Sequence, residues 1–284
     1  MAEDCFLEAH KINPLSEIPF LNAALLYTES DINKADIYMK KAFNINPENA
    51  NVNFLLGEIN THKKNYSLAV KFYSKAFQLS PQNFRMKVGL LQSFSLTNNW
   101  DLIDQCLDID MHKKVNHSPM LLMYVYDSPK KELELTAKYW KFAFSQPTTK
   151  LYLRRKKKIR IGYLSNDFFR HSVMFLLSRV IELHDKSRFE VYLYDFGVHI
   201  QDKMTKRMIA AADQYRMVKD LSNADLVKQV RDDEIDVAID LMGYTRDNRA
   251  SVFSNRVAPI QINMQGHPGT TGNDSMDYIL ADDC

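Results

Sequence analysis

The sequence has little cysteine and no long apolar run, and these absences exclude several classes of protein. Its three cysteines, Cys5, Cys106 and Cys284, are odd in number and far apart. This spacing argues against a disulfide framework and against a cysteine-based metal site. No apolar run approaches the roughly 18 residues of a membrane-spanning helix, and residues 1–10 lack the apolar core of a signal peptide. We therefore expect a protein of the reducing cytoplasm with no membrane span.

The chain also lacks an excess of charge of either sign. Its formal net charge is +2, so there is no electrostatic case for a nucleic-acid partner or an acidic lipid surface. Apolar residues make up 45% and charged residues 25% of the 284 residues, as in ordinary globular proteins. A chain of this length is expected to form one or two domains.

The first 83 residues contain an internal repeat with a period of about 34 residues. Ala35, Ala42 and Pro47 recur as Ala69, Ala76 and Pro81, and KKAFNINPEN recurs as SKAFQLSPQN. Small residues at fixed positions and a closing proline, which ends a helix, are typical of tetratricopeptide helix pairs. We predict such repeats over residues 1–116, with a truncated copy ending near 11–14 and a further helix over 100–107. Two clear repeats are fewer than a solenoid usually needs, so this array is expected to need further support for its stability.

Residues 117–158 are predicted to connect the repeats to the region that begins at Ile159. One helix of about 14 residues is expected there, with Leu133, Ala137, Trp140, Phe142 and Phe144 on its apolar face. The basic run at 154–158 is interpreted as a solvated linker. A role for this run in phosphate binding or nuclear import is a weaker alternative, because such runs are common.

From Ile159 onward, strand-like and helix-like patterns alternate. Strands are predicted near 159–165, 189–195, 215–219, 235–241, 260–264 and 277–281, and helices near 172–184, 201–213, 222–233 and 246–255. Alternation of this kind predicts a doubly wound α/β domain over residues 159–284. Residues 235–241 are rich in Val and Ile, as expected for a strand in the middle of a parallel sheet.

Three loops that follow strands should meet at one edge of this sheet: 165–172, 243–246 and 265–272. The third loop is rich in glycine, so its backbone can approach a ligand closely. It lacks the lysine of a P-loop, and the first loop lacks the GxGxxG pattern of dinucleotide-binding folds. Neither of these two modes of nucleotide binding is therefore supported.

Two histidines lie in these loops and are candidate general bases, because only histidine has a reference pKa near neutrality. A loop histidine is more often a hydrogen-bonded surface residue, so position alone makes His171 a weak candidate and His267 a weaker one. Asp167 can either orient His171 or cap the following helix. Its spacing from the helix favours the capping role.

The combined pattern resembles the protein O-GlcNAc transferase family, and its bacterial members most. The resemblance lies in the tetratricopeptide repeats, a connector with a tryptophan, and the phrases IRIGYLSNDFFRHSV, FEVYLYDFG, IDVAIDLMGYTRDNRASVFSNRVAPIQINMQGHPGTTG and MDYILADD. It implies half of a two-lobed GT-B fold after a helical repeat arm. It also implies transfer of N-acetylglucosamine from UDP-GlcNAc to Ser or Thr of a protein or peptide held by the repeats. No cofactor and no metal are implied.

The resemblance also implies roles for individual residues. His171 matches the family histidine proposed as the catalytic base, whose exact role is disputed. The residues that match the donor-sugar side of the cleft are Thr245, Gln265, Gly266, Pro268 and Gly269.

Two departures from the family pattern leave alternatives open. Leu55 stands where the family often has an asparagine that grips the acceptor. Family members also continue past the position of Cys284 into a second α/β lobe, which carries most nucleotide contacts. The chain is therefore expected to be a fragment, one part of a split enzyme or the product of a decayed gene, and to be inactive without that lobe. An inactive tetratricopeptide adaptor and a GDP-fucose-dependent enzyme are the alternatives.

Overall fold

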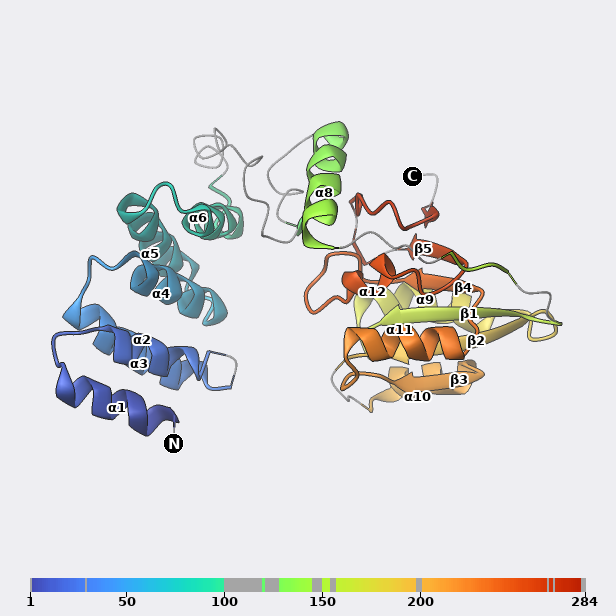
Figure 1. The fold of residues 1–284 in the computed structure, drawn as a ribbon, viewed down its shortest axis with the longest axis horizontal. Coiled ribbons are helices and arrows are strands. Elements are labelled where there is room, and N and C mark those ends of the chain that lie inside the picture. Colours follow the sequence, from blue (N-terminus) through green and yellow to red (C-terminus); the bar gives the residue numbers. More distant parts are fainter. Residues whose placement is uncertain are drawn as a thin grey trace. The chain divides into compact units, whose positions relative to one another are not determined.

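The computed structural model describes residues 2–28, 30–99, 119–120, 128–144, 150–153, 157–197, 201–264, 266–267 and 269–281. The chain divides into two compact units, Met1–Lys114 and Val115–Cys284 (Figure 1). The helix predicted over 100–107 lies outside the described residues. No helix in the described part of the chain is both long and apolar enough to cross a membrane.

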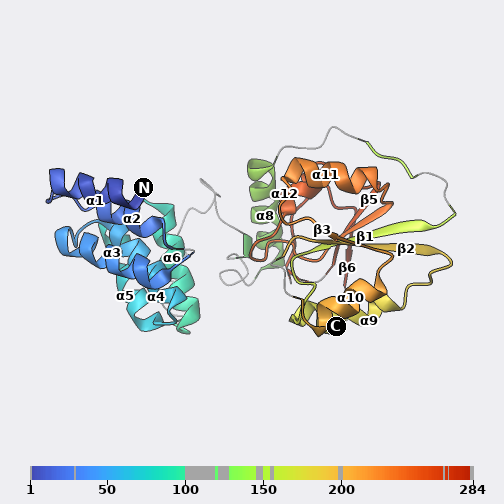
Figure 2. The same cartoon turned by 90° about the horizontal axis from the view of Figure 1, so that it is seen from below.

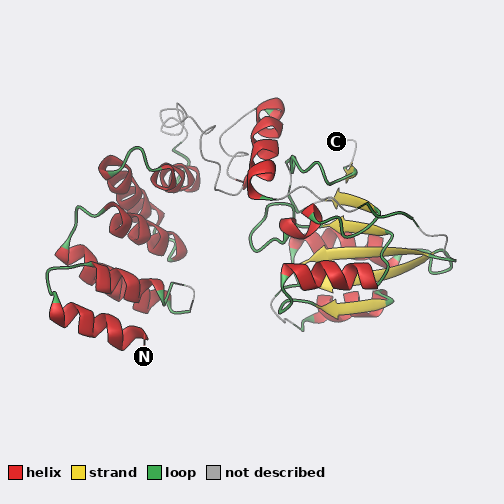
Figure 3. Ribbon diagram, in the orientation of Figure 1, coloured by secondary structure: helices red, strands yellow, loops and turns green. Residues whose placement is uncertain are grey.

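The first unit is helical throughout its described part, as the repeat predicted (Figure 3). Its helices are α1 (Ala2–Ile12), α2 (Ile18–Leu25), α3 (Ile32–Ile45), α4 (Ala50–His62), α5 (Tyr66–Leu79) and α6 (Phe84–Leu96). The repeated alanines Ala35, Ala42, Ala69 and Ala76 are all buried where neighbouring helices meet. Helix α1 lies within the predicted range, and its Glu3 binds Lys34 at 2.8 Å and the hydroxyls of Tyr27 and Tyr38.

Packing within the repeats explains why small residues recur. A Cβ atom added to Gly57 would lie 2.7 Å from the ring of Tyr73, and one added to Gly89 would lie 2.6 Å from the same ring. One tyrosine of α5 therefore packs against the backbones of both α4 and α6. Asn49 and Asn83, placed before these two helices, accept hydrogen bonds from their first amides.

The second unit contains a six-stranded parallel sheet with the order β3-β2-β1-β4-β5-β6. The strands are β1 (Ile159–Ser165), β2 (Phe189–Asp195), β3 (Gln214–Met217), β4 (Val237–Asp240), β5 (Ile260–Met264) and β6 (Tyr278–Leu280). The helices between them are α9 (Ser172–Glu182), α10 (Lys203–Ala211), α11 (Asn223–Asp232) and α12 (Ala250–Ser254). The predicted doubly wound α/β fold is confirmed.

Helices cover both faces of this sheet (Figure 2). Val173, Met174, Leu177 and Ile181 of α9 and Met208 of α10 share one apolar core with β1 and β2. Helices α11 and α12 form a second core on the other face. The outer side of α9 carries apolar residues too, and Phe175, Leu176 and Leu183 are exposed there.

Helix α8 (Pro129–Ala143) packs against the α/β unit through Trp140, which contacts Tyr244 and Ala250. The apolar face predicted for this helix was wrong in part. Leu133 and Phe142 are exposed, whereas Leu135 and Thr136 are buried. Phe142 lies two positions from Trp140, and residues two apart do not share a helix face. Thr136 tolerates burial because its hydroxyl donates to the carbonyl of Glu132 at 2.8 Å.

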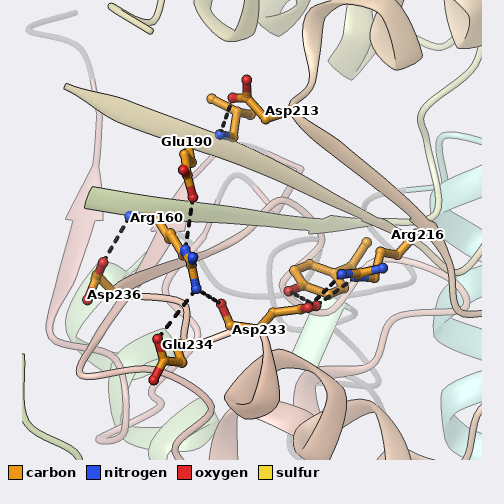
Figure 4. Close-up of polar contacts among 9 residues, drawn as sticks. Arg160, Glu190, Asp213, Arg216, Asp233, Glu234 and Asp236 are labelled. Atoms are coloured by element: carbon orange, nitrogen blue, oxygen red, sulfur yellow. Dashed lines mark hydrogen bonds and ion pairs between the residues drawn. The ribbon is translucent and has the colours of Figure 1, made fainter. Parts of the chain in front are cut away.

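An ion-pair network links several strands of the sheet (Figure 4). Arg160 of β1 binds Glu190 of β2 at 2.9 Å and the carbonyl of Asp233 at 3.0 Å. The Asp233 carboxylate in turn receives two hydrogen bonds from Arg216, at 2.7 and 2.6 Å, and one from Tyr194 at 2.8 Å. The network joins β1, β2 and β3 to the turn after α11. Arg160 and Glu190 lie near the amino ends of their strands, whereas Tyr194 and Arg216 lie one residue before the carboxyl ends of theirs.

Candidate active site

A cavity of about 470 Å³ lies over the carboxyl ends of the strands. Strands β1 and β4 are neighbours, yet α9 and α12 leave them toward opposite faces of the sheet. Such a switch point opens a crevice in which ligands of α/β proteins bind. The cavity is lined by Asn166, Asp167, Phe169, His171, Ser172, Val173, Phe196, Gly197, Lys219, Met242, Thr245, Arg246, Asp247 and Gly266. It thus brings together His171, Thr245 and Gly266 from three predicted loops.

The loop after β1 is fixed by its own backbone and by one buried ring. The amide of Asp167 donates to the hydroxyl of Ser165 at 3.0 Å, and Ser165 is fully buried. Phe168 is also fully buried and anchors the loop in the core beneath α9. The loop therefore presents Asp167, Phe169 and His171 to the cavity from a rigid base.

His171 is the N-cap of α9, and its Nδ1 receives the amide hydrogen of Val173 at 3.4 Å. The capping role predicted for Asp167 is therefore wrong, because the histidine itself occupies the cap position. Asp167 instead faces the imidazole, with Oδ2 3.3 Å from Nδ1 of His171. Burial raises the pKa of Asp167, while the nearby His171 lowers it and Asp195 raises it further.

The loop after β4 is organised by Asp240, the last residue of the strand. This buried carboxylate accepts hydrogen bonds from the amides of Met242 at 2.9 Å and Gly243 at 3.1 Å. Its burial raises its pKa to about 6. Thr245 follows in the same turn, and its hydroxyl donates to the carbonyl of Met242 at 2.9 Å. The threonine oxygen remains able to accept a hydrogen bond from a ligand in the cavity.

Among the described residues of the loop after β5, Gly266 lines the cavity and presents its backbone there. Gly266 has φ of +65°, and an added Cβ would lie 1.9 Å from the carbonyl oxygen of Leu241. Only glycine fits this position. Gly269 does not line the cavity. Gln265 and Pro268 lie outside the described residues, so their predicted roles stay predictions.

Helix α8 supports two of these loops from behind. Tyr244 donates to the carbonyl of Thr271 at 2.7 Å, and Glu132 accepts the amide of Thr270 at 3.2 Å. A Cβ atom added to Gly272 would lie 2.3 Å from the amide nitrogen of Ala137, so this glycine rests directly on the helix. His267 is buried edge-to-face against Tyr244 and does not line the cavity, and burial lowers its pKa.

Several cavity residues were not predicted. Phe196, Gly197 and Lys219 come from the ends of β2 and β3. Because both strands were predicted, the rule that polar loops follow parallel strands could have found these positions. Lys219 and Arg246 bring positive charge to the lining, and Asp167 and Asp247 bring negative charge. The cavity can therefore place a polar ligand between an imidazole, a hydroxyl and a bare stretch of backbone.

Comparison with known proteins agrees with this architecture. Residues 133–284 match the description "Glycosyl transferase family 41", and residues 50–83 match "Tetratricopeptide repeat". The first match covers more than half of the sequence, and the chain belongs to glycosyl transferase family 41.

Individual relatives are similar over less than half of this chain. A probable UDP-N-acetylglucosamine–peptide N-acetylglucosaminyltransferase of Arabidopsis thaliana is 33% identical over 127 residues, which are 45% of this chain and 13% of that protein. The corresponding Caenorhabditis elegans enzyme is 32% identical over 127 residues, or 44% of this chain and 11% of that protein. A mutant O-GlcNAc transferase of Thermobaculum terrenum has the same fold, with a TM-score of 0.59 and 24% identity. That match covers 99% of this chain and 49% of the bacterial one, so this chain spans only part of its relatives.

Proposed function

We propose that this chain forms one wall of the active site of a protein O-linked glycosyltransferase, which moves N-acetylglucosamine from UDP-GlcNAc to Ser or Thr. One observation carries the proposal: His171, Thr245 and Gly266 come from three separate loops and line one cavity at the switch point of a family 41 lobe. The relatives' names point to the same donor and to peptide acceptors.

The side chains in the cavity suit this reaction. The acceptor hydroxyl loses its proton as its oxygen attacks the anomeric carbon and the bond to the diphosphate breaks. The imidazole of His171 lines the cavity and can take this proton. Gly266 leaves room for the donor sugar to approach the backbone, and the hydroxyl of Thr245 can accept a hydrogen bond from it.

The helical repeats are proposed to bind the protein acceptor, since tetratricopeptide arrays present such surfaces. Two asparagines of α4 nevertheless donate their side-chain hydrogen bonds to nearby backbone carbonyls. The Asn53 amide donates to the carbonyls of Pro47 at 2.7 Å and Asn49 at 2.9 Å, and the Asn60 amide donates to that of Leu56 at 2.7 Å. These side chains support the helix and do not offer a ladder of free amides to a peptide.

We also propose that transfer needs a second lobe. The cations in the cavity lining, Lys219 and Arg246, are exposed, and a diphosphate is held best by buried, fixed donors. Positioning and electrostatic stabilisation act only when both sides of a cleft are present. Purified residues 1–284 are expected to bind UDP weakly and to leave a peptide unlabelled. Micromolar UDP binding that is lost on altering the 266–269 loop would show that this lobe holds more of the donor site.

Backbone amide chemical shifts of the ¹⁵N-labelled chain provide the direct test. Titration with UDP-GlcNAc should move the amides of Thr245, Gly266 and the residues around His171, with smaller changes for GDP-fucose. Shifts confined to other surfaces, or none in these three loops, would contradict the proposal and favour the inactive adaptor. Larger shifts with GDP-fucose than with UDP-GlcNAc would identify GDP-fucose as the donor.

A chimera extends the test to catalysis. This chain replaces the matched half of the Thermobaculum terrenum enzyme, and transfer to a peptide is measured. His171→Asn keeps a good N-cap residue but removes the base. It should reduce turnover about 10²–10⁴-fold, and turnover equal to that of the unaltered chimera would exclude His171 as the base.

A further inference from the structure

One nitrogen of His171 has two competing partners. Its Nδ1 lies 3.3 Å from Oδ2 of Asp167 and 3.4 Å from the amide nitrogen of Val173. A hydrogen on Nδ1 would be donated to the carboxylate, whereas a bare Nδ1 would accept the amide hydrogen. The two bonds require different tautomers, so only one of them forms fully at a time.

The choice of tautomer determines what the other nitrogen can do. With the hydrogen on Nδ1, the Nε2 atom on the far side of the ring carries a lone pair and can accept a proton. With the hydrogen on Nε2, the ring caps α9 well but offers the cavity a donor instead of a base. Capping and base catalysis therefore make opposite demands on the same imidazole.

We propose that Asp167 is a positioning residue that holds His171 in the tautomer with the hydrogen on Nδ1. The inference rests on the proposed function, because only a base role needs a lone pair on Nε2. A bond from an N–H to a carboxylate is stronger than one between an amide and a neutral ring nitrogen. The helix dipole of α9 also stabilises a negatively charged carboxylate near the amino end of this helix.

Asp167 is well placed to act in this way because it has little freedom to move. Its side chain is only 14% exposed. Its amide is held by Ser165 at 3.0 Å, and its carbonyl accepts the amide of Phe169 at 2.7 Å. The Phe169 ring lies against the imidazole, with ring centroids 5.7 Å apart. The carboxylate and the neighbouring aromatic ring together fix the plane of the histidine.

The tautomer can be measured directly in the full chain without donor or acceptor. Long-range ¹H–¹⁵N correlation of histidine-labelled protein at mildly alkaline pH distinguishes the two ring nitrogens and shows which of them carries the hydrogen. The His171 signals are assigned by their loss in His171→Asn. In the unaltered chain the pattern should be that of a hydrogen on Nδ1. The opposite pattern would overturn the proposal without any variant of Asp167.

Asp167→Asn is the informative variant. The new amide can donate to Nδ1, so the hydrogen should move to Nε2 and the signal pattern should invert. Asp232→Asn, which alters an exposed ion pair on α11, is the matched control and should leave the pattern unchanged. A His171 pattern that is the same in Asp167→Asn as in the unaltered chain would refute the positioning role.

These outcomes separate the inference from the proposed function. In the active chimera, Asp167→Asn should lower kcat about 10²–10⁴-fold with little change in KM. If the tautomer inverts but His171→Asn leaves turnover intact, the base role fails and the positioning contact stands. If His171→Asn abolishes turnover but Asp167→Asn changes neither tautomer nor kcat, only the positioning role fails.

Discussion

The buried carboxylate of Asp240 should make the α/β unit less stable at neutral pH than in mild acid. Burial raises its pKa from an ordinary 3.8 to about 6, even though two backbone amides and Asn263 favour the charged form. Between these values the folded chain binds a proton that the unfolded chain has lost. Stability from this group therefore falls as pH rises through the window and stays low above it.

The magnitude follows from the two pKa values. A separation of about two pH units corresponds to about 3 kcal/mol at neutral pH, of which about 2 kcal/mol is lost between pH 4.5 and pH 7.5. Asp240→Asn does not titrate. Its single oxygen can still accept from Met242, whereas the NH2 group that replaces Oδ2 cannot accept from Gly243. Its amide hydrogens can reach Asn263, whose Oδ1 has no partner among the described residues. The variant should gain about 2 kcal/mol relative to the unaltered chain over this pH range.

The assay is urea unfolding at the two pH values, followed by the fluorescence of Trp140. This residue is fully buried in the α/β unit, and Trp100→Phe removes the only other tryptophan. Asp240→Ala serves as a second variant, since it leaves two amides unpaired and should be less stable at both pH values. Parallel pH dependence for Asp240→Asn and the unaltered chain would refute the reasoning.

Three further predictions concern packing and charge. Gly272→Ala should destabilise the α/β unit by about 2 kcal/mol or more, because φ is +55° and the new Cβ meets the backbone of α8. Thermal unfolding followed by Trp140 fluorescence measures this loss, and an unchanged Tm would contradict the prediction. Asp233→Ala should lower the free energy of unfolding by about 2–3 kcal/mol, because it leaves Arg216 and a buried tyrosine hydroxyl unpaired. Asp232 is next to Asp233 but exposed, so Asp232→Ala should change the free energy of unfolding in urea little. Equal losses of stability in Asp233→Ala and Asp232→Ala would show that the contacts of Asp233 in Figure 4 do not stabilise the fold.

The fold could be predicted from the sequence because its strongest signals are local. The recurrence of alanine and proline predicted the helix pairs, and the alternation of strand-like with helix-like patterns predicted the six strands of the sheet. The rule that loops gather at the carboxyl ends of parallel strands then placed His171, Thr245 and Gly266 together.

Other features could not be predicted because they depend on contacts between distant residues. No local pattern shows that Gly272 would rest on α8 or that Thr136 would be buried there. The capping prediction for Asp167 failed because spacing alone does not reveal that the loop turns early and brings His171 to the cap position. Burial of His267 likewise follows from its contact with Tyr244, which lies in another loop.

The loops around the cavity touch through their backbones, and this limits how the site can change over evolutionary time. Gly266 meets the carbonyl of Leu241, and a Cβ atom on Gly197 would lie 2.2 Å from the carbonyl oxygen of Asn166. A side chain at either glycine would collide with the backbone of another loop, so these two positions tolerate few substitutions. Lining side chains such as Phe169, Phe196 and Arg246 are not subject to this backbone constraint. Substitution of the lining side chains can therefore alter ligand specificity while the backbone of the loops keeps its position.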